Sequence, residues 1–126
     1  MNLQNDVKMF MEAADQYTTE TPHFTLQNDA QSTLYMNLIC EEYTELNKAF
    51  SGRNMIETAD AVADLVWVVL GLCNTVGIPF EKVWEEVKSS NMSKVSENGK
   101  ILKRADGKIL KPDTYFQPNI APLLQS

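Results

Sequence analysis

The sequence predicts an all-α fold: a four-helix bundle with an irregular or hairpin-like C-terminal tail. Apolar residues recur at intervals of three and four through the helical body, about residues 5–95, which is typical of amphipathic helices. The basic extended tail, about residues 96–126, instead contains three prolines and two Gly-Lys motifs, which disfavour helix. A length of 126 residues suits one domain, so we expect residues 1–126 to form a single domain.

Four segments carry the helical pattern, and the third is apolar on nearly all sides. We therefore expect the third helix to be central and buried, with its tryptophan, Trp67, in the core. A Ser-Gly-Arg-Asn turn separates the second and third segments, so these helices should be antiparallel neighbours. The predicted helices run from Asn5 to Tyr17, from a cap at Asn28 or Asp29 to about Phe50, from about Met55 to about Gly77, and from about Pro79 to Ser89–Asn91.

The tail contains an internal repeat. Gly99-Lys-Ile-Leu-Lys103 recurs as Gly107-Lys-Ile-Leu-Lys111, and the pair Asp106-Gly107 lies between the two Ile-Leu pairs. An Asp-Gly pair between apolar segments indicates a hairpin, although two extended passes over the helical body would fit the pattern equally well. In either case the Ile-Leu pairs are expected to dock the tail.

Composition excludes several classes of protein. The longest apolar run, Ala61–Cys73, contains an aspartate and falls short of the about 20 residues that a bilayer requires, so no membrane segment is expected. Two widely spaced cysteines and no visible secretory signal predict a reduced, cytoplasmic protein. The single histidine, His23, argues against most zinc sites. The net charge is −6, and the acidic helical body argues against nucleic acid as a partner.

The second predicted helix places acids where its core face should be. Leu34 and Leu38 belong to its apolar stripe at 100° per residue. Glu42 and Glu45 fall inside the same stripe, and Glu41 lies at its edge. Burying unpaired carboxylates is costly, so these positions require a partner.

The third predicted helix repeats the anomaly. Glu57, Asp60 and Asp64 fall within one narrow arc that should face the acids of the second helix. Neither Lys48, which we place on the opposite side of its helix, nor Arg53 in the turn is expected to neutralise the set. A divalent cation with hard oxygen ligands, magnesium or manganese, would do so. The competing interpretation is a solvated acidic surface, which Glu41 alone would fit better.

The acidic motifs resemble those of a known group of enzymes. Glu41-Glu42-x-x-Glu45 followed by Glu57-x-x-Asp60 is similar to the EExxE and ExxD signature of MazG-like nucleotide pyrophosphohydrolases. That all-α superfamily also includes phosphoribosyl-ATP pyrophosphohydrolase and the dimeric dUTPases. The apolar run from Asp60 to Val69 and the Ser90–Lys94 segment also resemble it. The likeness spans about residues 30–116.

The resemblance implies a reaction and a set of roles. The reaction is magnesium-dependent hydrolysis of a nucleoside triphosphate between the α- and β-phosphates, which yields a nucleoside monophosphate and pyrophosphate. Glu41 would orient or deprotonate the attacking water. Either Asp60 or Asp64 could hold the aspartate position of the signature, and Asp60 is preferred because Glu57 precedes it by three residues. The implied metal ligands are Glu42, Glu45, Glu57 and Asp60, with Asp64 possible, and the implied substrate contacts are Asn91, Lys94 and Lys111.

The resemblance and the apolar third helix also imply self-association, as a homodimer or a dimer of dimers. We further expect the basic tail to fold over the acidic cleft and to contact phosphate through Lys94. Three alternatives remain open. The substrate could be phosphoribosyl-ATP, or the chain could be a non-catalytic helical partner-binding module. A di-iron bundle would need Glu-x-x-His pairs, which one histidine cannot supply.

Overall fold

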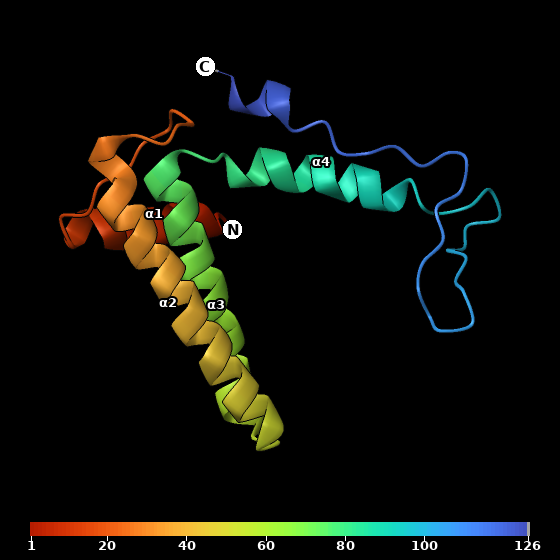
Figure 1. Ribbon diagram of the computed structural model, residues 1–126, viewed down its shortest axis with the longest axis horizontal. Coiled ribbons are helices and arrows are strands. Elements are labelled where there is room, and N and C mark those ends of the chain that lie inside the picture. Colours follow the sequence, from red (N-terminus) through yellow and green to blue (C-terminus); the bar gives the residue numbers. More distant parts are fainter. Residues whose placement is uncertain (126) are drawn as a thin grey trace. The chain divides into compact units, whose positions relative to one another are not determined.

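The computed structural model describes residues 1–125 and is all-α, as the sequence predicts (Figure 1). Within residues 1–125 the only β pairing consists of two isolated antiparallel bridges in the tail. No single helix in this part of the chain is both long and apolar enough to cross a membrane. The elements are α1 (Leu3–Ala13), α2 (Leu26–Ser51), α3 (Met55–Val76), α4 (Phe80–Met92) and a short 3-10 helix, η1 (Ala121–Leu124).

The chain forms two compact units, residues 1–80 and residues 81–125. The first contains α1, α2 and α3. The second contains nearly all of α4, together with the tail and η1.

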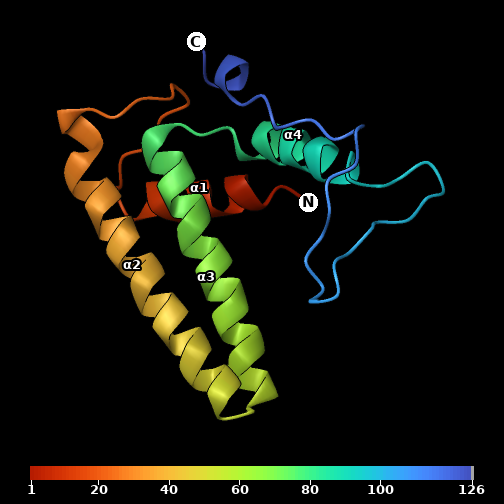
Figure 2. The same ribbon diagram turned by 45° about the vertical axis from the view of Figure 1, so that its right-hand side comes forward.

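Helices α2 and α3 form a long antiparallel hairpin (Figures 1 and 2). Thr25 caps α2 by accepting a hydrogen bond from Asn28 N, while Asn28 Oδ1 accepts one from Thr25 N. The predicted cap at Asn28 or Asp29 is therefore wrong, because Asn28 closes a capping box three residues inside the helix. Asn54 caps α3, and Gly77 ends it in the left-handed region at φ 80°.

Helix α1 ends at Ala13, earlier than the predicted end at Tyr17. Asp15 adopts a left-handed conformation at φ 56°, which stops the helix. Beyond this point, Tyr17 N donates to Gln31 Oε1 at 2.9 Å, and Gln31 Nε2 donates to Tyr17 O at 2.7 Å. Side-chain hydrogen bonds from α2 thus replace the helical bonds that the apolar pattern had indicated.

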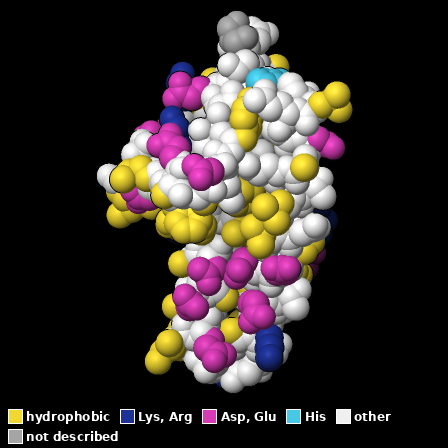
Figure 3. All heavy atoms as spheres, turned by 90° about the vertical axis from the view of Figure 1, so that its left-hand side faces the viewer, with side chains coloured by type: hydrophobic (Ala, Val, Ile, Leu, Met, Phe, Trp, Pro, Cys, Tyr) yellow, Lys and Arg dark blue, Asp and Glu magenta, His cyan; other side chains and the backbone are white. Residues whose placement is uncertain are grey.

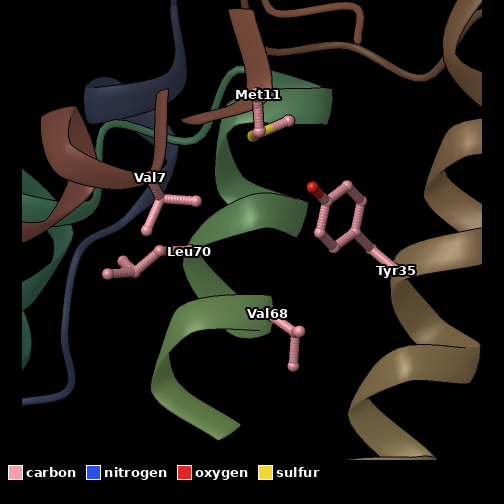
Figure 4. Close-up of a cluster of buried hydrophobic side chains, with 5 residues drawn as sticks. All are labelled: Val7, Met11, Tyr35, Val68 and Leu70. Carbon is pink, nitrogen blue, oxygen red and sulfur yellow. The ribbon is translucent and has the colours of Figure 1, made fainter. Parts of the chain in front are cut away.

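The core of the first unit is small and lies at one end of the α2–α3 hairpin. Val7 and Met11 of α1 pack with Tyr35 of α2 and with Val68 and Leu70 of α3 (Figure 4). Only the second half of α3 is buried, whereas the half nearest the turn is largely exposed. The expectation of a helix buried along its whole length is therefore wrong for a single chain.

The homodimer or dimer of dimers stays a prediction, and the surface of α3 suggests how to test it. The exposed half of α3 presents apolar side chains to solvent, including Met55, Val62 and Val66. Exposed apolar surface, where it is contiguous, commonly marks an interface. Light scattering at micromolar concentration should therefore give at least twice the 14.2 kDa of one chain. Val66→Glu should reduce the mass toward one chain, and a wild-type mass of 14.2 kDa would contradict the prediction.

In the second unit, the tail returns along α4 (Figures 1 and 2). Ser90 Oγ donates to Phe116 O at 2.8 Å, and Phe116 N donates to Ser93 Oγ at 3.1 Å. The tail makes two reversals at Gly99 and Gly107, both with positive φ, and each is closed by one bridge. The tail is thus hairpin-like, but its two Ile-Leu pairs stay exposed and do not dock it.

Candidate functional site

The register between α2 and α3 decides which acids meet. The ring of Tyr35 lies against Gly71, so closely that a Cβ built on this glycine would be 2.1 Å from Tyr35 Cε1. Two helical turns further along α2 lies Glu42, and two turns back along antiparallel α3 lies Asp64. Two carboxylates from different helices therefore stand at the same level.

Around this level the hairpin forms an open cleft of about 560 Å³ that gathers the five acids of the two sequence motifs together with Asp64. Figure 3 shows acidic side chains concentrated over one face of the molecule. The buried alanines Ala49 and Ala61 line the cleft from α2 and α3, where small side chains allow the helices to approach. Its acids are Glu41, Glu42, Glu45, Glu57, Asp60 and Asp64.

Two expectations about this cleft are wrong, one about its acids and one about Lys48. The acids do not point into a sealed core, because Glu42 is half-buried and the other five are exposed. Lys48 does not lie on the opposite side of α2, because it lines the same cleft. A lysine three residues after Glu45 is one turn along the same helical face, and that spacing could have revealed its position.

Burial and neighbouring negative charges act together on Glu42. Desolvation by burial raises the pKa of this carboxyl, and the negative charges of Asp64, Glu45, Glu41 and Asp60 raise it further. Because its pKa in the folded state is raised, Glu42 favours folding when protonated and loses this contribution as pH rises through that pKa. At neutral pH the cleft therefore holds charge repulsion that a bound cation would relieve.

The donor set of the cleft suits a hard cation, since carboxylate oxygens are the preferred ligands of magnesium and manganese. In their present positions, however, no three His, Cys, Asp or Glu side chains within residues 1–125 form a group that could hold a metal ion. The chemistry of the donors therefore fits a divalent cation, although in the described residues no three of them are grouped as a metal site.

The second unit brings together the three residues predicted to contact substrate. Lys94 Nζ donates to Asn91 Oδ1 at 3.1 Å and lies 5.8 Å from the ring centre of Tyr115. Lys111 Nζ lies 4.9 Å from the same ring centre. The sequence did not indicate that Tyr115 would join these residues. Two ammonium groups that share one aromatic ring form a local positive centre suited to an anion.

The sequence of this chain matches the model of one known protein family. The model of the family described as phosphoribosyl-ATP pyrophosphohydrolase matches residues 7–91, which is more than half of the chain and includes every acid of the cleft. No curated protein sequence matches the chain significantly.

Proposed function

The chain belongs to the phosphoribosyl-ATP pyrophosphohydrolase family, and we propose that it hydrolyses a nucleotide between its α- and β-phosphates. The family places it within the MazG-like superfamily of nucleotide pyrophosphatases. Our first candidate substrate is a nucleoside triphosphate, which would yield a nucleoside monophosphate and pyrophosphate. Phosphoribosyl-ATP is an equally plausible candidate, because it is named in the description of the matching family.

The observation that carries this proposal is the convergence of six carboxylates in one cleft between α2 and α3. Glu42, Glu45, Glu57 and Asp60 would hold magnesium or manganese, with Asp64 able to add a further oxygen. Five of the six acids are exposed, so their side chains have room to rotate inward once a cation offsets their repulsion. The cation, when bound, would polarise phosphate oxygens and offset charge that develops in the transition state.

Glu41 is the acid that we assign to the water rather than to the metal. It lines the same cleft and is exposed to solvent. A carboxylate in this place can accept a proton from a water molecule and direct the lone pair of that oxygen toward the phosphorus that is attacked. Glu41→Gln keeps the shape and removes this capacity, so it separates the proposed role from simple packing.

A panel of substrates tests the function. The four ribonucleoside triphosphates, the deoxynucleoside triphosphates and phosphoribosyl-ATP are each incubated with the protein and magnesium, and pyrophosphate release is measured. We expect release from at least one substrate, together with the matching monophosphate product. Release of inorganic phosphate alone would indicate cleavage at the γ-position and contradict the proposal. No release from any substrate would favour the non-catalytic partner-binding module.

We expect Lys94 to contact the phosphate chain of the substrate. Within the second unit, Lys94 lies beside Asn91 and shares the ring of Tyr115 with Lys111, and an ammonium group is a common partner of phosphate. Lys94→Ala should lower kcat/KM by at least tenfold, about 1.4 kcal/mol of transition-state stabilisation. Lys100→Ala, an exposed lysine in the same tail, is the matched control. Equal kcat/KM for the two variants would exclude this role.

A further inference from the structure

An exposed aromatic pair stands at the end of the acidic cleft nearest the core. Trp67, which the sequence placed in the core, is 38% exposed. Its ring centre lies 5.5 Å from that of Phe10 of α1, with an edge-to-face angle of 81°, and Phe10 is 55% exposed. Both helices belong to the first unit. Large aromatic side chains held together yet open to solvent have free surface for a flat ligand.

The position of Trp67 on α3 aligns it with the acids. It is two turns beyond Asp60, within about 20° of the same helical line, and about one turn beyond Asp64. Side chains on a helix lean toward its N-terminus, so the indole leans back toward the turn that carries Asp64. The exposed apolar residues Val62 and Val66 lie on other sides of α3, about 160° and 120° from Asp60.

On α2, the side chains that face the cleft change from acidic to apolar at the level of Trp67. Leu34 and Leu38 continue the line of Glu45 toward the end of α2 that packs near Tyr35. The register set by Tyr35 against Gly71 places Leu38 level with Val68, beside Trp67. Leu34 is 44% exposed, and Leu38 is partly buried against the core. Figure 3 shows apolar side chains directly beside the acidic ones on this face.

We propose that Phe10, Leu34, Leu38 and Trp67 form a ledge that binds the nucleobase of the substrate while the acidic cleft takes its phosphates. This inference rests on the proposed function and adds the place and the chemistry of base recognition. A nucleotide joins one flat aromatic ring to a charged chain. The surface offers the same two parts side by side. The apolar ledge suits the base, and the adjoining cleft of carboxylates suits a metal-bound polyphosphate.

The ledge also predicts weak discrimination among bases. Its surface is hydrocarbon and aromatic, and the indole N–H is its only side-chain polar group. Stacking on such a surface tolerates every base because each has a π-face. Strong rejection of a wrong base requires polar groups that the wrong base leaves unpaired. Values of kcat/KM for triphosphates that differ only in the base should therefore agree within about tenfold.

Fluorescence of single-tryptophan variants tests the ledge apart from catalysis. Trp84→Phe leaves Trp67 as the only tryptophan, and Trp67→Phe, the matched control, leaves only Trp84. Adenosine 5′-monophosphate should quench the emission of the Trp84→Phe variant saturably, since a stacked base contacts the indole. Ribose 5-phosphate, which lacks the base, should not. The Trp67→Phe variant should show no saturable quenching.

Steady-state kinetics provide a second test of the proposed ledge. Trp67→Ala should raise KM about tenfold or more with little change in kcat, while Trp67→Phe should keep most of the affinity because it preserves a stacking face. Circular dichroism checks that both variants fold. Quenching that does not need the base, or an unchanged KM in a folded Trp67→Ala variant, would overturn the ledge and leave the proposed function intact. A smaller mass in light scattering, without base-dependent quenching, would instead assign Trp67 to a contact between chains.

Discussion

Glu45→Gln is expected to lower kcat/KM by at least about a hundredfold, or about 2.7 kcal/mol of transition-state stabilisation. The amide keeps the size of the side chain but removes a negative charge from the cleft. In the wild type, millimolar magnesium or manganese should raise Tm, because a ligand that binds only the folded state stabilises it. In Glu45→Gln this rise should be lost or much reduced.

Without metal, we expect Glu45→Gln to have the opposite effect and to stabilise the protein. Glu45 is one of the charges that raise the pKa of Glu42, so its replacement reduces repulsion within the cleft. The metal-free variant should therefore melt at a higher temperature than the metal-free wild type, although its kcat/KM should be lower. Glu12→Gln removes an exposed carboxylate of α1 outside the cleft and should change neither property. A wild-type melting curve that magnesium leaves unmoved would contradict the proposed metal site.

The sequence could predict the α2–α3 hairpin because local and global signals agree there. The polar turn before Asn54, the glycine after Val76 and two acidic arcs at helical spacing all indicate the same pair of helices. The same spacing brings six acids to one cleft, as the structure has them. Both Asp60 and Asp64 line the cleft.

Other features depended on contacts that a helical pattern does not contain. Beyond the left-handed residue Asp15 that ends α1, the chain is held by hydrogen bonds between Tyr17 and Gln31, which are distant in the sequence. The burial of the acids was overestimated because the apolar stripe of α2 continues past the core, where no third helix of the first unit covers it. The assembly of Tyr115 with Lys94 and Lys111 depends on the path of the tail, and no periodicity encodes that path.

Gly71→Ala is expected to destabilise the protein by about 1–3 kcal/mol, although the same change inside a helix usually stabilises by about 0.5–1 kcal/mol. The sign reverses because the new methyl group would meet Tyr35 Cε1 at 2.1 Å. The ring cannot easily move aside. It is buried against Met11 and Val68, and its hydroxyl donates to Gln16 Oε1 at 2.5 Å. Thermal or denaturant unfolding of the variant measures the effect.

Two further variants identify the cause. Gly52→Ala, at a helix end where the new methyl group meets ordinary contacts of 3.4 Å or more, should be nearly neutral. In the double variant Tyr35→Leu with Gly71→Ala, the clash with the ring is absent, so the combined loss of stability should be smaller than the sum of the single losses. Strict additivity would show that the ring does not rest on Gly71. The same contact aligns Glu42 with Asp64 two turns away, so a folded Gly71→Ala variant should also lose activity as the hairpin is forced apart.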